Sequence, residues 1–512
     1  MKLFIESWSR HSDRYFDSRD FKKDLAGKTA RGGVVMLASQ GVRFGLQLGS
    51  TMALARLLTP QDFGLVGMVT VLMNLIVFFR DFGLTQATVQ RPEVTQQQIS
   101  NLFWVNIFIS LLIAVIFAGM SPLIALFYGR SELVTIAMVL SVGVLLEGVG
   151  LQHRALMFRV MDFKRLAFAD VGAQFLAVGI SVYIALSGHG YWALVGLTVS
   201  GACFRGAFFV ILTRWIPSLP RRRDGTKPFI AYGMNLFGFN LVKYFARNAD
   251  NLLIGRFIGA EALGFYANAY RFMLLPIQHI NGPLNKVLIS SLSRLQGDPR
   301  QYRNYYRKSL AVISYCVISI LGLMALCASE IVLLALGDQW TSIIPIFWAL
   351  IPLGYISATN FADGAVYASL GHTRRQFRWY LFVSPMTVAL MLVGLPWGTV
   401  GVAWGASAGW FIFRPISIFV CFHGTFLKCS DFLNPILRPT SLSFITTFTV
   451  WAIFSMAKFD VLELATFLSL LAKTLVFCVA WLIFDIILPG DEKAYRSFYR
   501  FYELLYLKKN EQ

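Results

Sequence analysis

The sequence predicts an all-α integral membrane protein with about 14 transmembrane helices, since apolar runs of membrane-spanning length recur along it. Two bulk properties support this class. Of the 512 residues, 56% are apolar and only 14% are charged, and the mean hydropathy is +0.60. Soluble domains carry about 25% charged residues. The composition therefore excludes a soluble enzyme, a disordered chain and a nucleic-acid-binding domain.

The predicted helices follow the apolar runs, because a helix needs about 20 mostly apolar residues to cross the hydrocarbon of a bilayer. In the first half of the chain the runs cover residues 31–56, 63–80, 99–127, 132–152, 166–187 and 190–213. In the second half they cover residues 229–255, 262–285, 309–336, 340–368, 379–396, 398–424, 440–457 and 462–489. The first, seventh and eighth runs contain internal charges.

Basic residues predict the orientation of these helices. If the N-terminus is cytoplasmic, the cytoplasmic segments hold 35 of the 46 Lys and Arg residues, the outer face holds four and the spans hold seven. By the positive-inside rule, both termini are expected in the cytoplasm. The polar, basic residues 1–30 are expected to remain as a cytoplasmic tail rather than a cleaved signal. The net charge of +19 then reflects orientation and contact with anionic lipid, not nucleic acid.

The loops argue against an enzyme. All predicted outer loops are short, whereas membrane polymerases and glycosyltransferases generally need a sizeable extramembrane segment to build a site. The longest cytoplasmic connections, near 214–228 and 286–308, are basic and contain no phosphate-binding Gly loop, HExxH motif or paired carboxylates. We therefore expect no catalytic activity, no metal site and no tightly bound cofactor.

An internal repeat is visible at an offset of 200 residues. When residues 40–65 are placed over 240–265, Arg43 meets Lys243, and Arg56 and Gly64 meet an Arg and a Gly. Matched polar and glycine positions without a gap are hard to obtain by chance between two apolar segments. Both copies start from the cytoplasmic side, so they predict two parallel six-helix bundles related by an axis along the membrane normal.

This repeat divides the chain into segments. The basic, proline-containing stretch RWIPSLPRRRDGTKP is expected to link the two bundles, and the last residues to form an amphipathic helix on the cytoplasmic surface. The predicted order is a tail (1–30), an N-terminal bundle (31–213), a linker (214–228), a C-terminal bundle (229–424), two additional helices (440–489) and an amphipathic tail (490–512).

Polar residues form matching stripes in the first and seventh predicted spans, with helical spacings of three and four. The stripes consist of Gln40, Arg43, Gln47 and Ser50, and of Asn240, Lys243, Arg247 and Asp250. A charge inside the bilayer is costly, so such residues face a cavity or a partner. We interpret the stripes as a cationic lumen for an anion such as phosphate or pyrophosphate. The alternative is a set of salt bridges that locks two helices.

Other intramembrane charges are weaker candidates. Arg271 either joins the lumen or extends to the membrane surface. Asp363, Arg80 and Asp81 are candidates for coupling or gating; the alternatives are a helix-end residue for Asp363 and a local ion pair for the other two. The acidic side chains Glu147 and Asp170 are expected to meet basic residues of the loops.

Three stretches resemble a known family: SQGVRFGLQLGSTMALARLLTPQDFGLVGM, RDFGLTQATVQ and ADNLLIGRFIGAEALGFYANAYR. They are similar to the polysaccharide-exporter branch of the MOP (multidrug/oligosaccharidyl-lipid/polysaccharide) exporter superfamily. The likeness is greatest to Wzx-type flippases of the colanic-acid and exopolysaccharide group, and it extends from about residue 25 to residue 490. The stretches are moderately specific for the family and poorly specific for the substrate.

The resemblance implies two six-helix lobes that alternate access and transport without ATP hydrolysis. It implies a polyprenyl-pyrophosphate-linked oligosaccharide substrate, translocated across the bacterial inner membrane for exopolysaccharide or lipopolysaccharide synthesis. Coupling to a proton or sodium gradient and contacts with other polysaccharide assembly proteins are left open. A cation-coupled exporter of the multidrug branch is the main alternative, although a lumen for cationic drugs should be acidic. A membrane glycosyl-polymerising enzyme is a third, disfavoured by the short loops.

Overall fold

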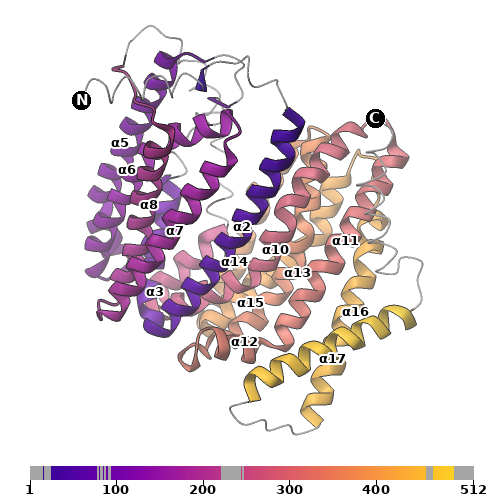
Figure 1. Cartoon of the computed structure of the whole chain (residues 1–512). Coiled ribbons are helices and arrows are strands. Elements are labelled where there is room, and N and C mark those ends of the chain that lie inside the picture. The colour runs from indigo at the N-terminus through magenta and orange to yellow at the C-terminus, as the bar shows by residue number, and fades with distance from the viewer. Residues whose placement is uncertain are drawn as a thin grey trace. The chain divides into compact units, whose positions relative to one another are not determined.

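The computed structural model describes residues 15–16, 25–77, 80, 85, 88–89, 94–220, 244, 247–456 and 465–488, and these residues form helices and connections with no strand. The chain divides into two compact units, Met1–Gly264 and Phe265–Gln512. Each unit is a bundle of long helices (Figure 1). The predicted all-α fold class is confirmed.

The first unit contains α2 (Leu25–Leu57), α3 (Pro60–Val77), α5 (Gln96–Tyr128), α6 (Glu132–Arg159), α7 (Phe163–Leu186) and α8 (Trp192–Thr213). Helix α10 (Ala260–Arg294) begins in the first unit and continues in the second. The second unit also contains α11 (Pro299–Leu326), α12 (Ala328–Ala335), η3 (Asp338–Trp340), α13 (Ile343–Ser369), α14 (Thr373–Gly394), η4 (Leu395–Trp397), α15 (Gly398–Phe422), α16 (Cys429–Met456) and α17 (Ala465–Ile487).

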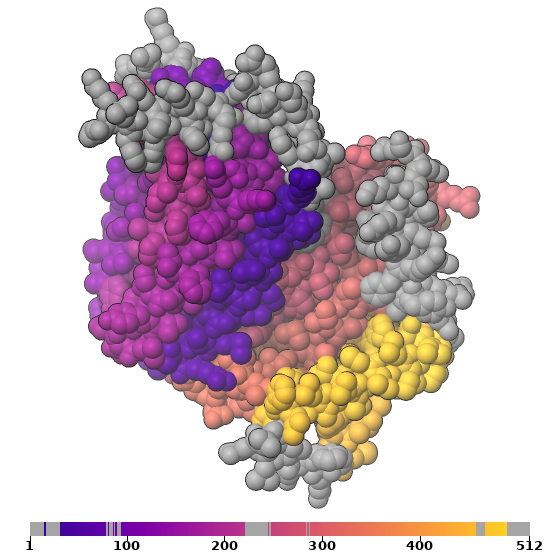
Figure 2. Space-filling view, in the orientation of Figure 1, coloured from indigo at the N-terminus to yellow at the C-terminus, as the bar shows by residue number. Residues whose placement is uncertain are grey.

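Membrane insertion is evident from the helix surfaces. Within the described residues, nine helical stretches are long and apolar enough to cross a bilayer, and one of them runs through both α14 and α15. Large apolar side chains are exposed on these helices, such as Leu126 at 78% and Phe411 at 69%. Figure 2 shows α17 lying on the surface of the second unit. Because such surfaces are stable in lipid rather than in water, the chain is a multi-pass membrane protein.

Several helices extend beyond the predicted apolar runs. Helix α11 begins at Pro299 and α16 at Cys429, each about three turns before the run that predicted it. Their first turns carry charged residues and caps, as at Asp298, whose carboxylate accepts from the backbone N–H groups of residues 300 and 301 at 3.0 Å. The predicted run 309–336 is also divided, since α11 ends at Leu326 and α12 begins at Ala328.

The two copies of the repeat meet in a reciprocal contact. A methyl group added at Gly64, in the second turn of α3, would overlap the carbonyl oxygen of Ala260, and one at Gly264, in the second turn of α10, would overlap that of Pro60. Residues 60 and 64 are the repeat equivalents of 260 and 264. Such a contact, in which i meets j′ and j meets i′, is the pattern of a local two-fold relation between these two helix starts. It supports the repeat that the sequence predicts.

The predicted linker is partly described. Its first residues are bound to the start of α5: Trp215 Nε1 donates to Gln96 Oε1 at 2.6 Å, and the backbone N–H of Ser218 donates to Ser100 Oγ at 2.9 Å. The contact-defined boundary at Gly264 lies further along the chain than this linker. Residues 221–243 and the predicted amphipathic tail 490–512 lie outside the described residues.

Candidate functional site

Close approach of α6 and α8 brings charged side chains together in the first unit. A methyl group at Gly150 on α6 would lie 3.4 Å from Cα of Gly206, and one at Gly206 would lie 3.2 Å from the carbonyl oxygen of Leu146. Small residues allow this approach between membrane helices. Glu147 and Arg205 flank these glycines, so their side chains meet across the two helices.

Glu147 binds two arginines. Its Oε2 lies 2.6 Å from Nη1 of Arg80, which follows α3, and its Oε1 lies 3.2 Å from Nη1 of Arg205 on α8. One carboxylate therefore links three segments of the first unit.

Asp170 on α7 lies among three arginines. Its Oδ2 is 3.2 Å from Nη1 of Arg43 on α2 and 4.0 Å from Nη2 of Arg154 on α6, and its Oδ1 is 3.8 Å from Nε of Arg205. The side chain of Gln174, one turn further along α7, donates to the backbone carbonyl of Arg43 at 3.2 Å and so fixes α2 against α7. Arg205 faces both carboxylates and joins the two halves of the site.

We call these residues the cationic cluster: Arg43, Arg80, Glu147, Arg154, Asp170 and Arg205. Among the residues that the structure describes, four guanidinium groups meet two carboxylates, which leaves a surplus of positive charge. The side chains of Arg43 and Arg154 are 42% and 40% exposed. A cavity of about 100 Å³ opens beside the cluster on its α6 and α8 side.

Unsatisfied donors indicate what the cluster can bind. The Nε–H groups of Arg80, Arg154 and Arg205 are buried, and each lacks a hydrogen-bond acceptor in the described part of the chain. Buried donors are normally paired, so an additional acceptor fits here. Guanidinium groups bind phosphate oxygens two at a time, which makes a phosphate-bearing anion the best match.

The structure places the predicted site residues in different environments. Arg43 and Arg80 belong to the cationic cluster. The side chains of Gln47 and Arg247 are exposed in the first unit, and Arg271 is exposed on α10 in the second. Asp250 is buried, and its Oδ1 accepts from the backbone N–H of Asn251 at 2.8 Å. Two further residues, Lys243 and Asp81, lie outside the described residues.

Sequence reasoning missed how these charges assemble. It expected Glu147 and Asp170 to meet basic loop residues, but Arg43, Arg154 and Arg205 all lie on helices, so that expectation is wrong for three of the four arginines. Periodicity within one helix cannot show which helices are neighbours. The available signal was the set of intramembrane arginines and carboxylates in the first half of the chain, whose charges had to be compensated by one another.

Asp363 has a different environment in the second unit. It is buried on α13, six residues before the helix ends at Ser369, and forms an ion pair with Arg414 on α15. Nη1 of Arg414 also donates to Asn360 Oδ1 at 2.7 Å. Among the described residues, no group of three or more His, Cys, Asp and Glu side chains is placed to hold a metal ion.

The fold and the cluster define a multi-pass membrane protein that gathers cationic side chains between its spanning helices. Residues 53–345, more than half of the chain, match the polysaccharide biosynthesis protein family, and the chain belongs to this family.

Individual relatives agree with this assignment. The chain is 26% identical over 377 residues to the teichuronic acid biosynthesis protein TuaB of Bacillus subtilis (strain 168), an alignment that covers 70% of this chain and 75% of that protein. It is 24% identical over 389 residues to the lipopolysaccharide biosynthesis protein WzxC of Escherichia coli (strain K12), covering 74% and 78%. Its fold is similar to that of the lipid II flippase MurJ in an inward closed conformation, with a TM-score of 0.71, 15% identity and coverage of 89% and 98%.

Proposed function

We propose that this protein is a flippase that moves a polyprenyl-pyrophosphate-linked oligosaccharide across the bacterial inner membrane for polysaccharide synthesis. The cationic cluster is the observation that carries this proposal. A surplus of guanidinium groups among apolar helices is costly unless an anion joins it. A pyrophosphate group that links a lipid to a sugar is an anion of suitable charge, and it enters from the membrane.

The surplus of positive charge also weighs against a purely structural role for the cluster. Salt bridges that only lock helices together are expected to balance in charge, because an uncompensated charge among apolar helices is costly. In the cluster, Arg43 and Arg154 share Asp170 with Arg205, and their side chains stay about two-fifths exposed. The arrangement therefore keeps guanidinium groups available to a ligand.

The same surplus disfavours the alternative, a cation-coupled exporter of the multidrug branch. A binding site for cationic drugs should carry net negative charge, whereas this cluster is net positive. The described part of the first unit thus matches an anionic lipid-linked substrate better than a cationic drug.

The proposed mechanism is alternating access of the two repeat-related lobes, with no catalytic step. Arg43, Gln47, Lys243, Arg247, Asp250 and Arg271 are proposed to line the substrate path. Asp363, Arg80 and Asp81 are proposed to take part in coupling or gating, with a proton or sodium gradient as the energy source. In this proposal both termini are cytoplasmic, and other polysaccharide assembly proteins act before and after transport.

Alanine substitution of the exposed cluster arginines tests the proposal. Arg43→Ala and Arg154→Ala should each reduce glycan export at least about tenfold while the protein still inserts, because each removes charge-assisted bonds worth about 1.5–3 kcal/mol. Export is measured by complementation of a strain that lacks the gene, with membrane abundance measured by immunoblot.

Arg165→Ala is the matched control. Arg165 is a similarly exposed arginine, at 37%, in an ion pair with Asp162 at the start of α7. It should retain full export. If Arg43→Ala and Arg154→Ala also export normally, the cluster serves to lock helices and the flippase proposal loses its main support.

A further inference from the structure

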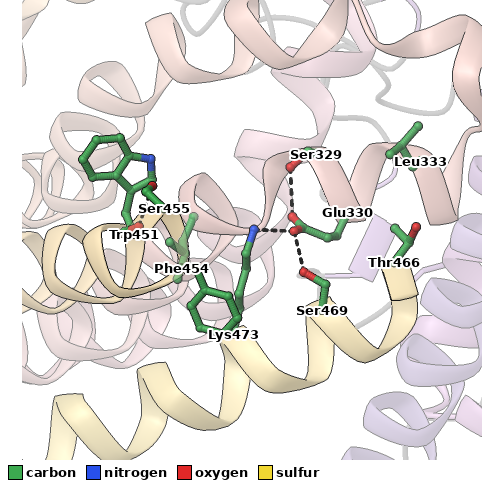
Figure 3. A pocket seen from close by; sticks show the side chains of 10 residues that line it. Ser329, Glu330, Leu333, Trp451, Phe454, Ser455, Thr466, Ser469 and Lys473 are labelled. Atoms are coloured by element: carbon green, nitrogen blue, oxygen red, sulfur yellow. Dashed lines mark hydrogen bonds and ion pairs between the residues drawn. The ribbon is translucent and has the colours of Figure 1, made fainter. Parts of the chain in front are cut away.

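A second charged cavity lies in the second unit, where α17 meets α12 and α16. Its volume is about 400 Å³. Figure 3 shows Glu330 of α12 pointing toward Lys473 and Ser469 of α17, with Trp451 and Ser455 contributed by α16. We call it the α17 cavity.

Glu330 and Lys473 form the polar centre of this cavity. Oε1 of Glu330 accepts from Lys473 Nζ and, at 2.9 Å, from Ser469 Oγ, while Oε2 accepts from Ser329 Oγ at 2.9 Å. The two charged side chains are only 9% and 17% exposed. An ammonium group has three N–H donors, and Glu330 takes one of them. The lining therefore carries one negative and one positive charge, and two N–H groups of Lys473 remain available to another acceptor.

The cavity opens on a helix whose other faces are apolar. Thr466, Ser469 and Lys473 are spaced by three and four residues and form one polar stripe on α17. Around this stripe, Leu475 is 65% exposed and Leu482 is 58% exposed, as expected of side chains that face acyl chains. The cavity thus joins a charged interior to a lipid-facing surface.

An ion pair between α16 and α17 shows that contact between these two helices does not require a cavity. Nη2 of Arg438 donates to the backbone carbonyl of Asp485 at 2.7 Å and to its Oδ1 at 3.3 Å. This pair holds the opposite end of α17. The space around Glu330 and Lys473 is therefore an additional feature, suited to a ligand.

We propose that the α17 cavity binds the head group of a zwitterionic phospholipid that carries a primary ammonium group. The lipid phosphate accepts hydrogen bonds from the spare N–H groups of Lys473, and the lipid ammonium donates to Glu330. The acyl chains lie along the apolar surface of α17. A net-neutral lining favours a zwitterion, because the buried carboxylate repels an anionic head group.

The bound lipid stabilises α17 against α12 and α16, and this role is independent of the transported substrate. A head group with its glycerol fits a cavity of about 400 Å³, which is within the usual range of small-molecule sites.

Lipid binding to the purified full-length protein tests this proposal. The protein is delipidated in detergent and titrated with dioleoyl-phosphatidylethanolamine, -phosphatidylcholine or -phosphatidylglycerol in mixed micelles, and bound lipid is counted by native mass spectrometry. Phosphatidylethanolamine should bind at least about tenfold more tightly than the other two, the size of one or two charge-assisted hydrogen bonds. Equal binding of all three lipids, or a preference for phosphatidylglycerol or phosphatidylcholine, would overturn the proposal.

Variants locate the binding. Glu330→Gln and Lys473→Gln should each weaken phosphatidylethanolamine binding about tenfold. Arg438→Gln, which breaks the α16–α17 ion pair with Asp485, should not. Ser455→Phe fills the cavity while it leaves the ion pair intact, so it should abolish selective binding even if the charge variants fail to fold. Retention of selectivity by Ser455→Phe would place the lipid elsewhere.

A soluble analogue separates a lipid site from a site for a free phosphate compound. Glycerophosphoethanolamine has the same charged groups and lacks acyl chains. It should compete at least about a hundredfold more weakly than the lipid, because it cannot bury apolar surface along α17. Competition equal to that of the lipid would show that the cavity takes a free solute.

Discussion

The cationic cluster of the first unit and the Arg414–Asp363 pair of the second use the same residue types with opposite consequences. In the cluster, four arginines share two carboxylates, and Arg43 and Arg154 are about two-fifths exposed. In the pair, one arginine meets one aspartate, and the two side chains are 9% and 6% exposed. An excess of accessible cations suits ligand binding, whereas a balanced and buried pair suits cohesion between helices.

The surroundings of Arg414 support this contrast. Its guanidinium also donates to Asn360, and its Cζ lies 4.5 Å from the centroid of the Phe432 ring. These contacts tie α15 to α13 and α16. A buried cation held by several neighbours is costly to release, so the pair and the cluster should respond differently to substitution.

The largest effect is expected at the buried pair. Asp363→Ala should lower the free energy of unfolding by about 3–5 kcal/mol, because it leaves the Arg414 charge buried without its carboxylate. The measurement is the midpoint of thermal unfolding in detergent, followed by fluorescence size-exclusion chromatography.

A double variant distinguishes a structural role of Asp363 in helix packing from a role in ion coupling. Asp363→Leu combined with Arg414→Met removes both charges and should recover most of the stability. If this double variant is stable and still exports glycan, Asp363 is a structural residue and its proposed coupling role is wrong. A stable double variant without export would instead favour coupling.

The glycine contact gives the next largest effect and compares the two copies of the repeat. Gly64→Ala and Gly264→Ala should each lower the free energy of unfolding by about 1–3 kcal/mol, because each new methyl group overlaps a backbone carbonyl. A Cβ added at Gly264 would also lie 3.3 Å from the backbone N of Gly64. The double variant should therefore lose less stability than the sum of the losses in the two single variants.

Gly67→Ala is the matched control for the glycine contact. Its methyl group would meet only the side chain of Leu263, at an ordinary 3.7 Å. Thermal unfolding midpoints are compared for the wild type and these four variants. Unequal effects of Gly64→Ala and Gly264→Ala would argue against a local two-fold relation between the two helix starts.

The sequence predicted features that depend on a single helix well, and it failed to predict features that depend on how several helices pack together. The apolar run 132–152 predicted α6, which spans Glu132–Arg159, because hydropathy reports the helix itself. The beginning of α11 was missed, since its first turns are charged and carry no hydropathic signal. The offset of 200 residues predicted a repeat, and the reciprocal glycine contact supports it.

The candidate site was only partly predictable for the same reason. Arg43 was identified from its position inside an apolar span. Its partner Asp170 is 127 residues away, and the choice among several acidic residues depends on which helices pack together. Likewise, Arg414 lies within the predicted run 398–424, and only the packing of α13 against α15 shows its pairing with Asp363.

A moderate effect is expected at Arg205, which bridges the two carboxylates of the cluster. Arg205→Gln should cost about 1–3 kcal/mol, because Glu147 and Asp170 each lose a cationic neighbour. Arg205→Lys keeps the charge and should recover part of this stability. Compared with Arg205→Gln, Arg43→Ala should lower the free energy of unfolding less and reduce glycan export more. If instead Arg43→Ala lowers stability more and export less, both residues serve only to hold the helices together.

The smallest effect is expected at Arg303. This residue tests whether exposure of an arginine alone, without a surplus of positive charge around it, affects export. Arg303 on α11 is 36% exposed, close to the value for Arg43, yet it contacts both oxygens of one carboxylate. Its Nε and Nη2 bind the two oxygens of Asp431 at 2.9 and 3.0 Å. Arg303→Lys keeps the charge and loses the two-point contact, so it should cost only about 0.5–1 kcal/mol, and export should stay at the wild-type level.

The matched change in the cluster is Arg43→Lys, which should reduce export because a phosphate ligand loses a two-oxygen contact. Thermal unfolding and glycan export are measured side by side for the two lysine variants. If Arg303→Lys impairs export as much as Arg43→Lys at equal abundance, an exposed arginine at either place affects transport. The surplus of charge in the cluster would then not be what distinguishes the substrate site.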